Sequence, residues 1–182
     1  MTLSFAIRLL PPDVAESASA SVAELINRAY GAADAEGAFW TIPNKPRTTA
    51  PAMAALISAS EVLAAYSPEL EVVGCVRLQR VDARTASLGM LAVGPGARGK
   101  GVGRDLVAAA EATARQRGYG VMQLEILRPT AGTHPGKEML ARWYRKLGYA
   151  LVGVETPAEF VPGMEKLLAC ECEFLVYRKD LA

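Results

Sequence analysis

The sequence predicts one α/β domain in which a mixed, mostly antiparallel sheet is flanked by helices. Two observations predict this fold class. Three strand-like runs in the middle of the chain are separated by short turns, which indicate antiparallel neighbours. After them a strand, a glycine-rich loop, a helix and another strand follow in order, and such a unit requires a parallel pair. The 182 residues suffice for one sizeable core, and neither a repeat nor an interior linker divides them.

The first third of the chain is expected to contain one strand and two helices. Residues 5–10 are strand-like, and the Pro-Pro-Asp sequence at 11–13 then starts a helix that reaches about Tyr30. This helix carries apolar residues at helical spacing. A connection follows, and Thr48 or Thr49 can cap a short second helix after it.

The rest of the chain consists of strands and helices that turn residues separate. Ser67-Pro68 and Asp82-Ala83 break the three middle strands, and Gly118 and Gly148 each stop a helix. The expected strands span 61–66, 71–81, 85–93, 121–127, 150–155 and 172–178, and the expected helices span 103–117 and 138–147, with one further helical turn at 165–169.

The charge balance argues against several function classes. Lysine and arginine number 20 and aspartate and glutamate 19, a net charge of +1. A nucleic-acid protein or a polybasic membrane module would need a basic face. The charge-free stretch 48–60 is too short to span a bilayer. Arg8 interrupts the N-terminal apolar run, so no secretory signal is expected.

The cysteines indicate neither a disulfide framework nor a metal centre. Cys75, Cys170 and Cys172 contain no CxxC pair, and His134 is the one histidine, so no zinc site of ordinary spacing can be assembled. We expect reduced, packed thiols in a cytoplasmic protein that uses no metal.

The most informative segment is the glycine-rich loop over 94–103. It reads Gly-Pro-Gly-Ala-Arg-Gly-Lys-Gly-Val-Gly, follows a strand and opens a helix. Glycines allow close approach of the backbone to a ligand, and a helix start directs free N–H groups and positive charge toward anions. Arg98, Lys100 and Arg104 add charge. A phosphate-bearing ligand is therefore expected, and a tight turn beside a solvated basic cluster is the alternative.

Two familiar phosphate-binding patterns fit this loop only in part. Gly94, Gly96 and Gly99 match the GxGxxG of dinucleotide folds, but three strands with tight turns precede them, whereas a dinucleotide fold begins with the motif. The same loop also matches GxxxxGK of a P-loop. There the next residue, Gly101, lacks the hydroxyl that would hold magnesium.

A third pattern fits better. Residues 98–103 read Arg-x-x-Gly-x-Gly after a strand that ends Leu-Ala-Val, and residues 143–149 read Trp-Tyr-Arg-Lys-Leu-Gly-Tyr. In both signatures the chain resembles the GNAT superfamily of N-acetyltransferases. The match is specific across 88–155 and architectural before it. The resemblance implies the acyl-CoA N-acyltransferase (GNAT) fold as a single domain over 1–182, with acetyl-CoA as the acyl-donor cosubstrate.

The resemblance also implies which residues bind this cosubstrate. In the family the glycine loop cradles the pyrophosphate, and backbone N–H groups on the splayed edge of the fourth strand polarise the thioester carbonyl. The cofactor-binding residues expected here are Leu91, Ala92, Val93, Arg98, Gly99, Lys100, Gly101, Val102, Gly103 and Arg104.

Two residues are candidates for proton transfer. Tyr144 matches the family's general-acid position, and a tyrosine that stays protonated suits a departing thiolate; the alternative is a core aromatic on an apolar helix face. Glu125 interrupts an apolar strand and faces either a cleft or solvent, which makes it a candidate for a catalytic role. The sequence does not identify the general base, and many enzymes that the chain resembles use chains of water molecules instead of a dedicated base. His134 reads as a plain loop residue. Its loop, 128–137, lacks the asparagine that relatives often carry there.

The acceptor is left open by the sequence. Tyr30, Phe39 and Trp40 can line an aromatic pocket or simply pack a long connection against the sheet. We expect an acyltransferase that acetylates an amine of a small molecule or peptide, without nucleic-acid or membrane partners, and a homodimer is compatible with the sequence. The alternatives are a non-catalytic acyl-CoA-binding domain and a magnesium-dependent nucleotide-binding protein.

Overall fold

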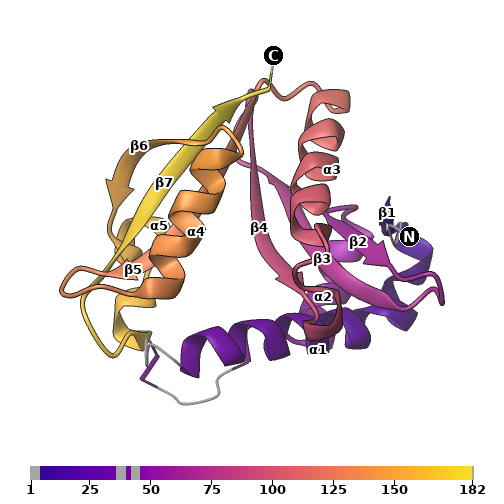
Figure 1. Ribbon diagram of the computed structural model, residues 1–182, viewed down its shortest axis with the longest axis horizontal. Coiled ribbons are helices and arrows are strands. Elements are labelled where there is room, and N and C mark those ends of the chain that lie inside the picture. The colour runs from indigo at the N-terminus through magenta and orange to yellow at the C-terminus, as the bar shows by residue number, and fades with distance from the viewer. Residues whose placement is uncertain (1–4, 36–39, 42–45, 182) are drawn as a thin grey trace.

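The computed structural model describes residues 5–35, 40–41 and 46–181, which form one seven-stranded sheet in the order β1-β2-β3-β4-β5-β7-β6 (Figure 1). Every neighbouring pair is antiparallel except β4 and β5, which run parallel. The predicted fold class is therefore confirmed. The strands are β1 (Ala6–Leu9), β2 (Val62–Tyr66), β3 (Val72–Arg80), β4 (Thr85–Val93), β5 (Val121–Pro129), β6 (Ala150–Glu155) and β7 (Cys172–Asp180).

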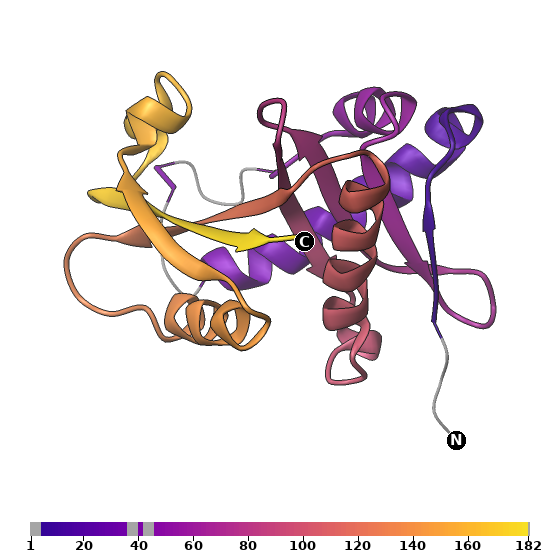
Figure 2. The same ribbon diagram turned by 90° about the horizontal axis from the view of Figure 1, so that it is seen from above.

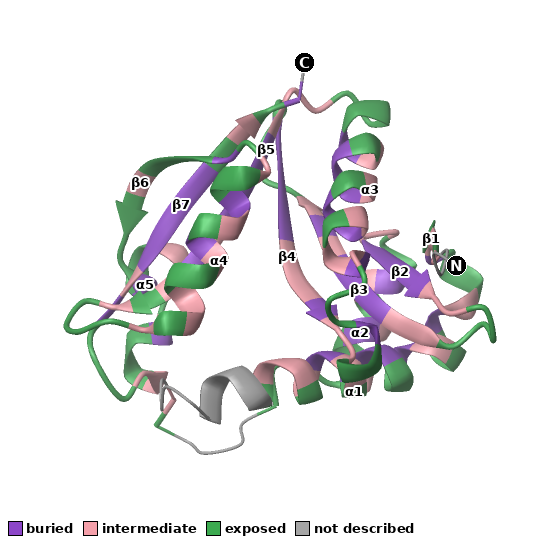
Figure 3. Cartoon of the chain, in the orientation of Figure 1, coloured by how far each residue is buried: buried purple, intermediate pink, exposed green. Residues whose placement is uncertain are grey.

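Helices cover both faces of this sheet. They are α1 (Ala15–Ala35), α2 (Ala50–Ser58), α3 (Val102–Gln116), α4 (Pro135–Lys146) and α5 (Pro157–Phe160). Alternate residues of β2 show the two layers. Leu63 and Ala65 belong to the core that includes α3 and α4, and Val62 and Ala64 belong to the core that includes α1 and α2. Figure 2 shows α3 and α4 on one side of the sheet with α2 on the other, and Figure 3 shows the burial along β4, β5 and β7.

The sheet divides between its two parallel strands. Pairing of β4 with β5 joins Thr85–Ser87 to 121–123 and goes no further within the described residues. Beyond that point both strands continue for six residues, to Val93 and Pro129, and their ribbons diverge (Figure 1). Backbone groups on the facing edges of the two strands are thereby left to bind something other than the neighbouring strand.

A β-bulge bends β4 within this diverging part. Arg77 pairs with Gly89 and Cys75 with Ala92, so two residues of β4 lie opposite one residue of β3. One of the two, Met90, has a φ of +49°, which is strained for a residue with a side chain. The bulge begins three residues beyond Ser87, the last residue of β4 that pairs with β5, and a bulge bends the strand that carries it.

The close approach of α3 to the sheet depends on a glycine in β3. A Cβ on Gly74 would lie 3.0 Å from Leu106 Cδ1, 3.1 Å from Val102 Cγ1 and 3.2 Å from the Ala92 carbonyl oxygen. Both side chains belong to α3, whose first residue is Val102. The absence of a side chain at position 74 therefore determines how closely the helix start packs on β3 and β4.

Gly74→Ala is expected to lower the free energy of unfolding by about 1–3 kcal/mol, because one methyl group overfills this contact. The matched control is Gly89→Ala in β4, where a Cβ meets nothing within 4 Å. Urea unfolding of the three proteins checks this. Equal midpoints for the two variants would contradict the packing described.

Several elements differ from the sequence-based expectation. α1 continues past Tyr30 to Ala35, and α4 begins at Pro135, three residues before the expected start, because His134 caps it. α5 was not expected, although Thr156 and Glu159 form a capping box around it. No described helix is long and apolar enough to cross a membrane.

The three cysteines do not share one environment. Cys75 and Cys172 are buried, and burial raises the pKa of both thiols to about 12. Cys170 is exposed, with its Sγ 3.6 Å from that of Cys172. The prediction of packed thiols is therefore wrong for Cys170, which lies in the connection before β7, outside either core.

Candidate active site

The glycine loop forms a cradle of backbone groups at the start of α3. Gly99 and Gly101 have φ of +73° and +87°, a conformation that disfavours residues with side chains. The first intrahelical bond runs from the Asp105 amide to the Gly101 carbonyl at 3.1 Å. The amides of residues 102–104 precede it and point out of the helix start, where the helix dipole is positive. This arrangement suits an anionic ligand.

Cationic side chains surround this cradle. Arg98, Lys100 and Arg104 are all exposed. The Arg98 Nε donates to the Val93 carbonyl at 3.1 Å, and Arg104 pairs with Asp105 at 3.3 Å. The glycine loop is thus tied to the end of β4, and Lys100 has no partner among the described hydrogen bonds and ion pairs.

Gly103 lies where the cradle meets α4 and β4. A Cβ there would lie 3.7 Å from Val93 Cγ2 and 3.9 Å from the Trp143 ring, which are ordinary contacts. The helix start, the end of β4 and the Trp143 side chain therefore adjoin one another. Two signatures some forty residues apart in the sequence meet at this point.

The end of β4 directs peptide groups away from β3. The Gly94 amide donates to the Val73 carbonyl at 2.9 Å, so it faces β3. In a strand the N–H and C=O of one residue point to the same side, and those of the next residue point to the other side. The N–H and C=O of Val93 therefore face away from β3, and the Val93 carbonyl accordingly accepts from Arg98. Leu91, two residues earlier, shares this direction, whereas Ala92 faces β3. Of the three predicted strand residues, Leu91 and Val93 thus direct peptide groups toward the divergence.

Tyr144 lies in the core between α3 and α4. Its side chain is 6% exposed, and its ring packs edge-on against Trp143 at 4.7 Å and Tyr149 at 5.7 Å between centroids. Burial, and then the nearby Tyr30, raise the pKa of its hydroxyl well above the ordinary value. The hydroxyl therefore stays protonated. The packing agrees with the core interpretation and leaves the proton-donor role as a prediction.

Glu125 lies two residues beyond the last pair of β4 and β5. Its neighbours Leu124 and Ile126 face the α3–α4 core, so Glu125 faces the opposite side of the sheet, where α1 and α2 lie. Its Oε2 accepts from Ser87 Oγ at 3.4 Å and its Oε1 from Gln123 Nε2 at 2.7 Å. Burial raises the pKa of this carboxyl despite the two hydrogen bonds. It is half-buried at the divergence rather than on open surface.

His134 has a structural role that the sequence analysis did not assign. It is the N-cap of α4, and its Nδ1 accepts from the Lys137 amide at 3.3 Å. Histidine is uncommon among capping residues, so the usual capping preference gave no signal. The described residues contain no group of three or more His, Cys, Asp or Glu side chains that could hold a metal ion.

Trp40, one of the aromatic residues expected near the acceptor, lies against a part of the chain that is distant in the sequence. Trp40 forms a β-bridge with Leu168, and the Thr41 amide donates to the Leu167 carbonyl at 2.9 Å. These contacts join the α1–α2 connection to the β6–β7 connection. Tyr30 lies within α1, and its charge interaction contributes to the raised pKa of Tyr144. Phe39 lies outside the described residues.

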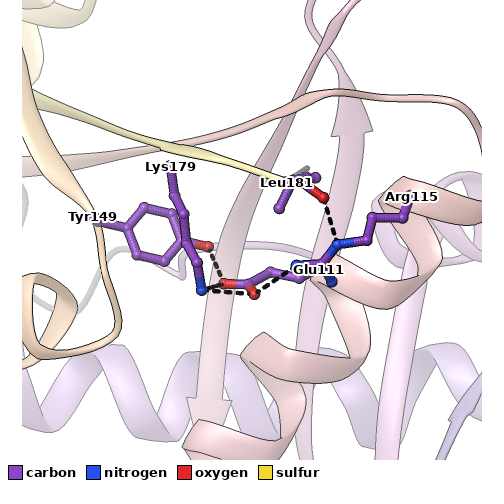
Figure 4. A network of polar contacts seen from close by, with 5 residues as sticks. All are labelled: Glu111, Arg115, Tyr149, Lys179 and Leu181. Atoms are coloured by element: carbon purple, nitrogen blue, oxygen red, sulfur yellow. Dashed lines mark hydrogen bonds and ion pairs between the residues drawn. The ribbon is translucent and has the colours of Figure 1, made fainter.

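A polar network centred on the buried Glu111 fastens α3 to β7 (Figure 4). Glu111 accepts from the Tyr149 hydroxyl at 2.9 Å and from Lys179 Nζ at 2.8 and 2.9 Å. Arg115 Nε donates to the Leu181 carbonyl at 2.6 Å. The Tyr149 ring packs against Tyr144, the candidate general acid. By holding the Tyr149 hydroxyl, the network therefore fixes one of the rings that surround Tyr144. The hydrogen bonds that join α3 to Tyr149, Lys179 and Leu181 link residues 38 to 68 positions apart, so no local pattern indicated them.

Known proteins resemble the chain in sequence pattern and in fold. A family model described as the acetyltransferase (GNAT) family matches residues 20–149. No curated protein sequence matches significantly.

Among solved structures, nourseothricin acetyltransferase is 24% identical over 66% of this chain, with a TM-score of 0.51, and this chain spans about two thirds (65%) of its length. Ard1 from Thermoplasma volcanium is 15% identical over 99% of both chains, with a TM-score of 0.68. The yncA protein from Salmonella typhimurium, solved with its cofactor acetyl-CoA, is 16% identical over 98% of this chain and 95% of its own, with a TM-score of 0.64.

At these identities the structural matches show the fold alone, whereas the family model covers well over half of the chain. It includes the cradle and Tyr144, the two features that the sequence signatures marked. The chain belongs to the acetyltransferase (GNAT) family.

Proposed function

We propose that this protein transfers an acetyl group from acetyl-CoA directly to an amine of a small molecule or peptide. The observation that carries the proposal is the junction of an anion-suited helix start with the free edge of β4, at the point where β4 leaves β5. Acetyl-CoA needs both features, because it carries a pyrophosphate and a thioester joined by a long arm. The complex of yncA with acetyl-CoA supports this choice.

In this proposal the residues around the cradle bind the pyrophosphate. The amides of 99–103 face it, and Arg98, Lys100 and Arg104 supply positive charge. The backbone groups of Leu91 and Val93 hydrogen-bond the arm of acetyl-CoA, and their N–H groups polarise the thioester carbonyl by donating to its oxygen. No metal is needed for either interaction.

The two candidate proton-transfer groups lie on opposite faces of the sheet. Glu125 faces the α1–α2 side and Tyr144 belongs to the α3–α4 side. An amine that enters from the first side would lose its proton to Glu125 as its nitrogen attacks the thioester carbonyl carbon. The carbon–sulfur bond then breaks on the second side, and the Tyr144 hydroxyl protonates the departing thiolate. The reaction is thus divided between the two faces at the strand divergence.

Of the three alternative functions, the fold disagrees with the two nucleotide-binding patterns and is compatible with a non-catalytic domain. Gly99 and Gly101 precede the first residue of α3, and four antiparallel-paired strands lie on one side of the motif, so the dinucleotide and P-loop patterns do not describe this fold. A non-catalytic acyl-CoA-binding domain is the remaining rival, because the loop before α4 lacks the asparagine that relatives often carry.

Release of the CoA thiol separates catalysis from binding. Acetyl-CoA is mixed with a panel of small amines, aminoglycosides, amino acids and peptides, and free thiol is measured with and without protein. We expect acceptor-dependent release with at least one class. Calorimetric binding of acetyl-CoA with no release from any class would favour the non-catalytic domain.

The pH profile tests the proposed base. Burial raises the pKa of Glu125, so the carboxylate is the ionised, active form only above that raised value. The value of kcat/KM should therefore fall as the pH drops through a pKa above the ordinary 4.3 or so of glutamate. Glu125→Gln should lower the rate and remove this acid limb. An unchanged limb in Glu125→Gln would assign the base elsewhere.

A further inference from the structure

We propose that Gln123 and Arg178 form a positioning relay that holds the Glu125 carboxylate in the orientation needed to take a proton from the acceptor amine. The inference rests on the proposed function, since it presumes that Glu125 is the base. It adds two positioning residues that neither the glycine-loop signature nor the Tyr144 signature contains.

The relay is a chain of hydrogen bonds across three strands. Arg178 of β7 pairs in register with Gln123 of β5, and its Nε donates to Gln123 Oε1 at 2.8 Å. Gln123 Nε2 in turn donates to Glu125 Oε1 at 2.7 Å. Ser87 of β4 holds the other carboxylate oxygen from the opposite strand at 3.4 Å. Both oxygens of the candidate base are therefore tied to the point where β4 and β5 part.

The two ends of the Gln123 amide make this chain directional. Its oxygen only accepts and its nitrogen only donates, whereas a guanidinium only donates and a carboxylate only accepts. A reversed amide would place its oxygen against Glu125 and its NH2 group against Arg178, and both contacts would be repulsive. Arg178 therefore selects the one amide orientation in which Gln123 donates to the base.

Burial excludes water, which would otherwise compete for the hydrogen bonds of Gln123 and Ser87. Gln123 is 6% exposed and Ser87 3%, so little water reaches either side chain, whereas Arg178 lies at the surface. A buried amide that loses its partner cannot exchange it for water. The relay thus connects a surface cation to a half-buried carboxylate through one side chain of restricted orientation.

Two charged side chains act on Glu125 among the residues that the structure describes. Glu155 of β6 raises its pKa, and Arg178 lowers it through space. Arg178 consequently has two separable effects on the base, its charge and its hydrogen bond to Gln123. Arg178→Lys retains the charge and changes the geometry, whereas Arg178→Gln removes the charge.

The test compares Gln123→Met, Arg178→Gln and Arg178→Lys with the wild type. Arg128→Met is the matched control, because Arg128 and Glu173 form a pair across the same two strands without touching Glu125. Every protein is assayed with the same amine acceptor, the one for which the wild type releases thiol. Acetyl-CoA affinity and urea midpoints are recorded for each protein, and kcat is measured across pH.

We expect Gln123→Met to lower kcat by about 10-fold at the plateau and to move the acid limb to higher pH, because a donor to the ionised carboxylate is lost. Arg178→Gln should move the limb in the same direction, and Arg178→Lys should restore part of the loss. Acetyl-CoA affinity and the Arg128→Met profile should stay at wild-type values.

The relay would be overturned if Gln123→Met and Arg178→Gln kept the wild-type plateau value of kcat and the wild-type acid limb of the pH profile. An equal fall of kcat in Arg128→Met would overturn it as well. If Gln123→Met does not fold, the exposed Arg178 variants decide alone. A wild type that releases no thiol with any acceptor refutes the proposed function instead, so the two failures are distinguishable.

Discussion

Replacing Gly103 by aspartate is expected to abolish acetyl-CoA binding while the fold is retained. The new Cβ would meet Val93 and Trp143 at ordinary contact distances of 3.7 and 3.9 Å, so the backbone need not move. The carboxylate would instead add bulk and negative charge among the amides that are proposed to hold the pyrophosphate. Gly101→Asp is a poorer test, because the φ of +87° at that position strains any side chain.

Gly103→Ala is the matched control for this experiment. It adds the same Cβ without charge and should keep the affinity within several-fold. Calorimetric titration of the two variants and the wild type with CoA checks the prediction, and thermal unfolding shows whether each variant folds. Equal affinities for the aspartate and alanine variants would remove the cradle assignment.

Replacing Tyr144 by phenylalanine is expected to lower the catalytic rate by about 10²-fold, the lower range for loss of a general acid. The ring remains and its contacts with Trp143 and Tyr149 persist, so stability and CoA affinity should change little. Tyr177→Phe is the control, because Tyr177 is a fully buried tyrosine of the same core. Steady-state kinetics with an active acceptor give the comparison.

Similar rates for wild type, Tyr144→Phe and Tyr177→Phe would show that Tyr144 only packs the core. The basic side of the pH profile follows from the same burial. Because the pKa of Tyr144 lies well above the ordinary tyrosine value of about 10, the wild type should show no fall from this group up to that pH. A basic limb near neutral pH would have to come from another residue.

Features carried by neighbouring residues could be predicted from the sequence. The cradle lies within ten consecutive residues, and its glycines indicated both the loop and the start of α3. The parallel pair of β4 and β5 followed from the strand–helix–strand order, and short turns indicated the antiparallel strands before it. In each case the determining signal is local or depends on connection length.

Features that depend on partners distant in the sequence could not be predicted. The insertion of β7 between β5 and β6 leaves no trace in the periodicity of either strand. Glu125 was recognised as unusual in an apolar strand, but its face and its contacts with Ser87 and Gln123 required the sheet register. The ion pair of Glu111 with Lys179 could not be predicted either. A charged residue on an amphipathic helix ordinarily indicates the solvated face, whereas Glu111 is buried against β7.

Direct transfer of the acetyl group can be measured with acetyl-CoA labelled at the acetyl carbonyl carbon. The protein is incubated with this donor and an active amine, and mass spectrometry follows the label while free thiol is counted. The site described predicts one labelled acetyl group on the amine nitrogen for each thiol released, with none on the protein. Label that appears only in acetate or on the protein, or that never leaves bound acetyl-CoA, would contradict direct transfer at the divergence of β4 and β5.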